Sequence, residues 1–259
     1  MARRIRSSRK KRWRRIRRWT LVIGLVVVLL LGVGALIAWD MSRQAPTWWR
    51  ELDLESGAAA EAARTIEDHI ASEMHEVDRP ADASAPDGSW QSEPWSFALT
   101  AADANAWLNT RLWSWLANRD ERFTKPDEIA ELQVDFDEGL VRLGARVRVA
   151  GREQIVTASV RPEIRSDGAF WIPANSFTLG RLGLPSSMVL DQAGERLLRI
   201  AEQSGGGERE FRALVGALTG DAPLFLEPVV ELSGGRRVRL LSVRARQGYL
   251  EITCRTEHE

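Results

Sequence analysis

Hydrophobic positions divide the chain into one long uninterrupted run and several periodic segments. Residues 20–39 carry no charge, and thirteen of these twenty positions are Leu, Ile or Val. A helix rises about 1.5 Å per residue, so a helix of this length is about 30 Å long and matches the hydrocarbon core of a bilayer. The run therefore predicts a single transmembrane helix over residues 20–39.

Charges beside this run predict its orientation. Residues 1–19 form a basic tail with eleven Arg or Lys and no acidic residue. Because basic loops stay on the cytoplasmic side, we expect a cytoplasmic N-terminus and an extracytoplasmic C-terminal part. Arginine greatly outnumbers lysine, which is typical of a GC-rich genome and favours a bacterial source. The expectation is a single-pass protein of the inner, or cytoplasmic, membrane.

Two other interpretations of the N-terminus are less favoured. A cleaved signal peptide has an apolar stretch of about 7–15 residues, which is shorter than this run, so we expect an uncleaved signal-anchor. The basic tail could bind nucleic acid, but a basic segment beside a span usually sets topology and attracts the lipid bilayer. After the tail, 25 basic residues face 36 acidic ones, which argues against a nucleic-acid partner there.

Residues 40–94 are interpreted as a juxtamembrane connector. Apolar residues recur at spacings of three and four within 58–77, which predicts an amphipathic helix that docks on the domain or on another chain. Pro80 ends this pattern because proline cannot continue a helix. Residues 78–94 contain three prolines and predict a linker without regular structure.

Residues 95–259 predict an extracytoplasmic α+β domain. Thr100 followed by Asp103 resembles a capping box and predicts the start of a helix over residues 101–118. Trp107 and Trp115 lie on one face of this helix, so we expect it to be central to the core.

Alternation of period two follows the predicted helix. It predicts a four-stranded antiparallel meander between residues 129 and 174, with one apolar face and one polar face. The apolar face must be covered, and the tryptophan-bearing helix is the nearest cover. Later patterns predict helices over 188–201 and 208–218 and strands over 224–232, 238–243 and 249–254.

The sequence contains no motif that identifies an enzyme, a metal site or a cofactor site. His69 and His75 are six residues apart on the predicted helix and do not share a face, and His258 lies near the C-terminus. Asp135, Asp137 and Glu138 gather at a hairpin, which is interpreted as an acidic turn rather than a calcium site. The only cysteine, Cys254, shares a strand face with Leu250 and Ile252 and is expected to be a core residue.

Two short phrases carry a resemblance to a known family. LTAADANAWL (99–108) starts the predicted helix with Thr100, Asn105 and a Trp-Leu pair, and GRLGLP (180–185) follows the meander. With the final hairpin, this order resembles YpmS-like and YceB-like bacterial extracytoplasmic domains, relatives of the tubular lipid-binding (TULIP) superfamily. The resemblance covers roughly residues 95–254 and implies a long helix packed on a curved antiparallel meander, with an apolar groove that binds lipid.

These observations give one functional hypothesis and two alternatives. The hypothesis is a non-enzymatic membrane protein that binds a lipid or other apolar ligand between the helix and the sheet. The expected lining residues are Trp107, Leu108, Leu112, Trp115, Val141, Leu143, Val147 and Val149. The first alternative is an interaction module with a solid core, which docks on a cell-envelope protein through helix 58–77 or through the face of Arg142, Arg146 and Arg148. The second, a hydrolase, would need a carboxylate pair that the sequence does not single out.

Overall fold

The structure is a computed structural model of the chain and describes residues 30–54, 57–76, 89–119, 124–149, 151–185, 189 and 208–258. The chain divides into two compact units, with the boundary between Gln44 and Ala45. In the first unit residues 30–41 are helical. Within the described ranges no helix is both long enough and apolar enough to cross a membrane. Residues 20–29 of the predicted span lie outside those ranges, so the span remains a prediction.

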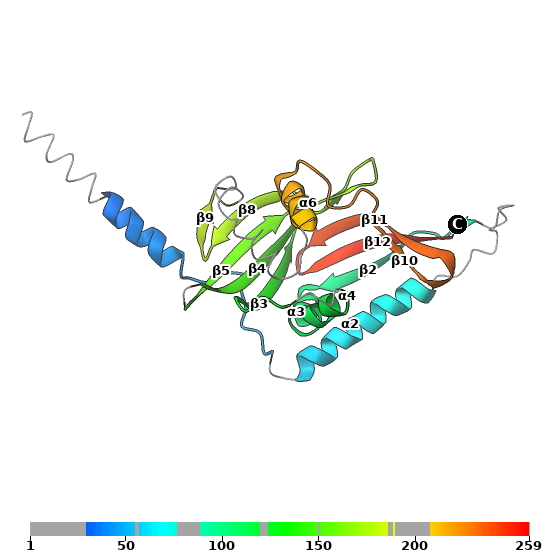
Figure 1. The fold of residues 1–259 in the computed structure, drawn as a ribbon, viewed down its shortest axis with the longest axis horizontal. Helices are drawn as coiled ribbons and strands as arrows, with labels where there is room; N and C mark the ends of the chain where they lie inside the picture. Colours follow the sequence, from blue (N-terminus) through cyan, green and yellow to red (C-terminus); the bar gives the residue numbers. More distant parts are fainter. Residues whose placement is uncertain are drawn as a thin grey trace, which may run out of the picture. The chain divides into compact units, whose positions relative to one another are not determined.

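The second unit is an α+β structure with antiparallel sheets (Figure 1). One sheet, called here the meander sheet, has five strands in the order β3-β4-β5-β8-β9. Their bounds are β3 Ile129–Asp137, β4 Leu140–Val149, β5 Arg152–Val160, β8 Ala174–Leu179 and β9 Leu182–Leu184. The antiparallel meander predicted from the alternating residues is thus confirmed for its first three strands, whereas the fourth strand predicted at residues 170–174 is wrong, because β8 takes the place beside β5.

The C-terminal sheet is built around a long hairpin. Its strands β11 (Arg236–Arg246) and β12 (Tyr249–His258) pair along almost their whole length. Strand β10 (Val229–Glu231) pairs with β11, while β2 (Trp95–Thr100) and β1 (Trp90–Gln91) both pair with β12. The prediction of no regular structure over 78–94 is therefore wrong at Trp90 and Gln91, because the far end of β12 offers these residues backbone partners.

Two prolines divide the strand pattern predicted between residues 156 and 174. Strand β5 ends at Val160, and a separate hairpin of β6 (Glu163–Ile164) and β7 (Phe170–Trp171) comes before β8. Pro162 and Pro173 lie in the two connections, and proline cannot donate a backbone hydrogen bond to a neighbouring strand. Period two alone did not reveal this interruption.

The tips of two hairpins join the sheets. The Gly139 N–H donates to the Ala245 carbonyl at 3.0 Å, and the Gly248 N–H donates to the Phe136 carbonyl at 3.0 Å. Gly139 and Gly248 have φ values of +70° and +87°, which glycine adopts without steric cost. The two sheets therefore meet at these turns and share one core.

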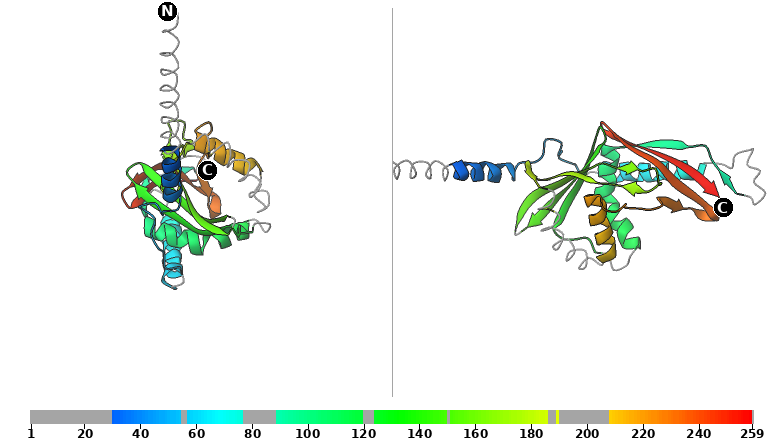
Figure 2. Two further views of the ribbon diagram at one scale, coloured as in Figure 1. Left: turned by 90° about the vertical axis from the view of Figure 1, so that its left-hand side faces the viewer. Right: turned by 90° about the horizontal axis from the view of Figure 1, so that it is seen from above.

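The described helices of this unit are α2 (Gly57–Glu76), α3 (Ala101–Thr110), α4 (Leu112–Arg119) and α6 (Glu208–Thr219). Helix α2 packs on α3, as Figures 1 and 2 show. Thr100 caps α3 as predicted, because its hydroxyl accepts from the Asp103 N–H at 3.2 Å. The single helix predicted over 101–118 is wrong at Arg111, where a φ of −118° separates α3 from α4.

The shared core lies where α3 meets both sheets. Ala101 and Ala104 bring the helix close to the strands, because their side chains are small. The buried cluster consists of Ala101, Ala104, Val134, Phe136, Val141, Val160 and Ala245. Leu108 of α3 and Leu218 of α6 pack against it and are partly buried. Both helices are thus anchored at the same end of the meander sheet.

Several other predictions have clear outcomes. The helix predicted over 208–218 and the hairpin on either side of Gly248 are confirmed as α6, β11 and β12. The strand predicted over 224–232 is reduced to β10. Cys254 is a buried core residue as expected, and burial raises the pKa of its thiol to about 11. The helix predicted over 188–201 lies outside the described residues except for Val189.

Glu257 is a buried carboxylate on the outer face of the C-terminal sheet. Arg237 Nε and Arg239 Nε donate to its two oxygens at 3.0 and 2.9 Å. Burial raises its pKa, but hydrogen bonds and charge from the two arginines outweigh burial, so that the pKa lies below its ordinary value. Because the folded pKa is lowered, this carboxylate stabilises the fold above the unfolded pKa.

We expect Glu257→Gln to lower the free energy of unfolding by about 2 kcal/mol at pH 7, because two arginines lose their counter-charge. The difference from wild type should shrink as the pH falls below 4.5, the ordinary pKa of glutamate, because the unfolded chain then binds a proton that the folded carboxylate, with its lowered pKa, does not yet bind. Chemical denaturation at a series of pH values measures it. Glu251→Gln, on the same strand and face, is the matched control and should cost little. A difference that stays constant down to pH 2.5 would contradict the electrostatic origin.

Candidate functional site

Two asparagines fix helix α3 along the edge of strand β3. Asn105 donates to the Val134 carbonyl at 2.9 Å and accepts from the Val134 N–H at 2.6 Å. Asn109 makes the same pair with Leu132, at 2.7 and 3.0 Å. Each side-chain amide thus takes the place of a neighbouring strand. The arrangement closes this edge of the meander sheet and fixes which side of α3 faces it.

This docking directs Trp107 toward α2 instead of the sheet. The Trp107 Nε1–H donates to Glu67 Oε1 at 2.8 Å, and Arg111 Nη2 donates to Glu67 Oε2 at 2.9 Å. The bond from Arg111 outweighs the effect of burial and lowers the pKa of Glu67. The apolar residues Ala63 and Ile66 of α2 are buried. Helix α2 therefore docks on its own domain, one of the two possibilities left open by its sequence.

The eight predicted lining residues have different surroundings. Leu108 and Val141 belong to the core where α3 meets the sheet. Trp107 is bound to α2, and its ring lies 6.2 Å from the Trp115 ring, edge to face. Leu112 and Val147 are half-buried. Leu143 and Trp115 are 41 and 45 % exposed. Val149 belongs to β4, but its side chain lies outside what the structure describes.

Leu143 lies in the middle of the apolar face of the meander sheet. Cross-strand pairing places it between Val134 of β3 and Ala158 of β5. The registers put the following side chains on this face: Leu132, Val134, Phe136, Val141, Leu143, Ala145, Val147, Val156, Ala158, Val160, Phe177, Leu179, Leu182 and Leu184. The apolar face is therefore covered at Val141 but partly open two residues farther along β4.

The opposite, outer face of this sheet is covered by the chain that precedes α2. Gln133 is 2 % exposed and binds the backbone of Arg50, accepting from its N–H at 3.1 Å and donating to its carbonyl. Trp48 and Trp49 rest on Gly144, where a Cβ atom would lie 2.9 and 2.7 Å from their rings. A segment predicted as a connector is thus part of the folded domain.

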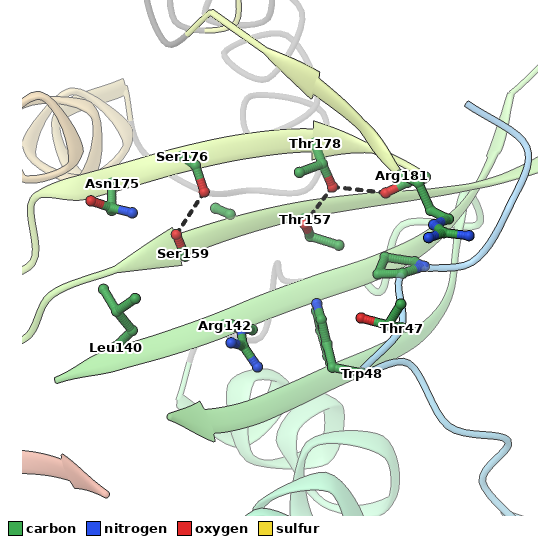
Figure 3. Close-up of a pocket in the computed structure, with 13 residues that line it drawn as sticks. Thr47, Trp48, Leu140, Arg142, Thr157, Ser159, Asn175, Ser176, Thr178 and Arg181 are labelled. Atoms are coloured by element: carbon green, nitrogen blue, oxygen red, sulfur yellow. Dashed lines mark hydrogen bonds between the residues drawn. The ribbon is translucent and has the colours of Figure 1, made fainter. Parts of the chain in front are cut away.

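A pocket of about 420 Å³ lies on this outer face beside the segment (Figure 3). Its floor is formed by β4, β5 and β8, and one wall is formed by Pro46, Thr47 and Trp48. The remaining lining residues are Leu140, Arg142, Thr157, Ala158, Ser159, Asn175, Ser176, Thr178, Gly180 and Arg181. Most of these lining residues are polar, whereas the side chains on the other face of the same strands are mostly apolar.

Hydroxyl groups form two cross-strand pairs on the pocket floor. Thr157 pairs with Thr178 at 2.7 Å, and Ser159 pairs with Ser176 at 2.8 Å. The register shifts by one residue between Ser176 and Ala174, so that Asn175 is the additional residue of a β-bulge. A bulge redirects side chains, and Asn175 lines the pocket together with Ser176.

Carboxylates neutralise the arginine at one end of the pocket. Arg142 Nη1 donates to Asp135 at 2.8 Å, and Arg142 Nη2 donates to Asp137. Of the cluster predicted as an acidic turn, Asp135 and Asp137 thus belong to the outer face of the sheet, whereas Glu138 lies in the turn between β3 and β4. In the part of the chain that the structure describes, no three His, Cys, Asp or Glu residues come together as metal ligands would.

The outer pocket was not predicted from the sequence. Two signals were visible: Gly144 interrupts the row of arginines on the polar face of β4, and small hydroxyl residues occupy the polar positions of β5 and β8. Small side chains on a solvent face leave room above a sheet. Neither signal indicates that residues 46–48 complete the site.

No protein-family model, curated protein or solved structure matches this chain. The fold defines its class as an α+β protein with antiparallel sheets.

Proposed function

We propose that this is a membrane-anchored extracytoplasmic protein that binds a lipid or another apolar ligand on the apolar face of its meander sheet. The exposure of Leu143 carries the proposal, because its neighbours on that face are almost all apolar. Apolar surface left in water costs about 25 cal/mol per Å², so an acyl chain that covers it would be stabilised there.

The surroundings of Leu143 suggest which predicted residues take part. Val141 and Leu108 would form the closed end of the site, because they pack in the core beside it. Val147 would continue the floor along β4, and Leu112 and Trp115 of α4 would add apolar surface at its side. Trp107 has a structural role in the proposal, since its indole N–H is already bound to Glu67.

Two arguments from the sequence support a lipid as the ligand. The uncharged run at residues 20–39 would anchor the domain beside a bilayer, which is a source of acyl chains. The resemblance to TULIP-related domains implies an apolar groove between a helix and an antiparallel sheet. Both arguments are independent of the exposure of Leu143.

The alternative of a docking module has less support. Its two proposed surfaces are already in use within the domain: α2 buries Ala63 and Ile66, and the face of Arg142 and Arg146 lies beneath Trp48 and Trp49. A partner would have to displace these contacts. We therefore favour ligand binding over docking through either surface.

Photocrosslinking tests the proposal. The full chain in nanodiscs of phosphatidylethanolamine and phosphatidylglycerol would be supplied with phosphatidylethanolamine that carries a diazirine in one acyl chain. We expect labelled peptides from β4 and β5 in addition to labels in the anchor. Leu143→Arg should reduce labelling of β4 and β5 about tenfold or more, because it places a charge against the acyl chain.

Leu226→Arg is the matched control, since Leu226 is 76 % exposed in a loop outside the sheet. It should leave the labelling pattern unchanged. Labels confined to the anchor in the wild type would contradict the proposal. Unchanged labelling of β4 and β5 in a folded Leu143→Arg protein would contradict this location for the ligand.

A further inference from the structure

We propose that the outer pocket of the meander sheet is a second binding site, and that its ligand is an uncharged saccharide. Ala158 is the one strand residue of the apolar face that also lines this pocket; the side chains of the two sites otherwise differ, because alternate residues of the same strands point to opposite faces of the sheet. Its volume of about 420 Å³ falls within the range of about 300–1,000 Å³ typical of small-molecule sites.

The direction of the hydrogen bonds on the pocket floor determines what a ligand must offer. Thr178 donates its only hydroxyl hydrogen to the Gly180 carbonyl at 2.9 Å. Thr157 must then be the donor in its pair with Thr178, so both hydroxyl hydrogens are used within the protein. What remains on these two residues is oxygen lone pairs. A ligand that binds here must donate hydrogen bonds.

The second hydroxyl pair, Ser159 with Ser176, offers a ligand both a hydrogen-bond donor and hydrogen-bond acceptors. In Ser159 and Ser176 one hydroxyl donates to the other, so one hydrogen and the remaining lone pairs face the pocket. Asn175 adds an amide, which both donates and accepts. Sugar hydroxyl groups also both donate and accept, so a saccharide matches this floor. Three of the four oxygens of a hydrogen phosphate dianion can only accept hydrogen bonds, and they would meet lone pairs at Thr157 and Thr178.

The charges at the Arg142 end of the pocket also disfavour an anion. Arg142 is paired with Asp135 and Asp137, so that its positive charge is more than balanced at that end of the site. Because the charge of Arg142 is already neutralised, an anionic ligand would gain little electrostatic attraction from it. An uncharged ligand does not need an unneutralised positive charge, and it can still accept hydrogen bonds from the remaining guanidinium N–H groups of Arg142.

Trp48 supplies an apolar wall. Figure 3 shows its ring standing up from the sheet beside Arg142, with Thr47 on the other side. The ring is held there because it rests on Gly144 and contacts Trp49, with 5.7 Å between the ring centroids. A rigid aromatic surface can bury the carbon-bound face of a sugar ring while the floor binds its hydroxyl groups.

Binding of defined disaccharides to the full chain in nanodiscs tests the proposal. Saturation-transfer NMR and titration calorimetry would use maltose, trehalose and N,N′-diacetylchitobiose, with orthophosphate as the anionic probe. We expect at least one disaccharide to bind and orthophosphate neither to bind nor to compete. Thr178→Val should weaken the disaccharide about tenfold, because it removes an acceptor from the floor.

Thr253→Val is the matched control. Thr253 forms the same kind of hydroxyl pair with Ser96, at 2.9 Å, in the C-terminal sheet. It should leave binding unchanged. If Thr178→Val does not fold, Asn175→Ala serves instead, since Asn175 is exposed at a bulge, and should weaken binding about threefold. The proposal is overturned if none of the three disaccharides binds, if orthophosphate binds in their place, or if the pocket variants bind as well as wild type.

Discussion

Replacing Asn105 by alanine should lower the free energy of unfolding by about 2–5 kcal/mol, the largest effect that we expect from a single side chain. The substitution leaves both the N–H and the carbonyl of Val134 without the partner that Asn105 provides. Asn105 is 7 % exposed, so water cannot easily replace the lost amide. Chemical denaturation of the full chain, followed by circular dichroism, measures the effect.

Two further alanine substitutions make this result interpretable. Asn109→Ala removes the same pair of bonds from Leu132, but at a half-buried position, so we expect a smaller loss, about 1–2 kcal/mol. Asn118→Ala changes an exposed residue of α4 and corrects for the higher helix propensity of alanine. Equal losses at positions 105 and 118 would show that the buried amide does not fix α3 to the sheet.

The second large effect should come from adding one methyl group to Gly144. Its Cβ would lie 2.7 Å from Trp49 Cζ3 and 2.9 Å from Trp48 Cη2, which is too close for carbon atoms. Gly144→Ala should therefore cost about 1–3 kcal/mol, although alanine suits a strand better than glycine does. We also expect faster hydrogen exchange at the Arg50 amide, since Trp49 would be displaced next to its bond to Gln133.

Gly183→Ala is the matched control for Gly144→Ala. Gly183 is also a strand glycine of the meander sheet, and a Cβ atom there would meet nothing within 4 Å. It should be neutral or slightly stabilising and leave Arg50 exchange unchanged. If both variants have the same free energy of unfolding and the same Arg50 exchange rate, the two tryptophans do not pack tightly against the sheet at Gly144. If only Gly144→Ala shows the defects, the segment before α2 is an integral part of the fold.

The sequence shows only part of the contacts on which the predictions at Asn105 and Asn109 depend. Asn105 and Asn109 are four residues apart on a helix, so a shared face was visible. Their partners are not, because Val134 lies 29 residues away on a strand with no feature that indicates a free edge. The contact of Trp107 was hidden for a related reason, because its partner Glu67 lies 40 residues away on α2.

The apolar site and the outer pocket also differ in how far the sequence could predict them. The apolar face with Leu143 follows from alternation within one strand, so sequence reasoning could name Val141, Leu143 and Val147. The outer pocket combines residues 46–48 with three strands and with a bulge at Asn175. A bulge shifts the alternation by one residue, and no local pattern predicted that shift.

The sequence by itself determined the features that depend on neighbouring residues. Helix α2, helix α6, the cap at Thr100 and the long hairpin that turns at Gly248 were all predicted from spacing, capping and turn chemistry, because their backbone hydrogen bonds join residues close in the chain. Only the tertiary structure decided which faces meet: Asn105 with Val134, Trp107 with Glu67, and Trp48 with Gly144. These contacts join residues far apart in the chain and depend on how whole elements pack. Periodicity within a single segment therefore cannot predict them.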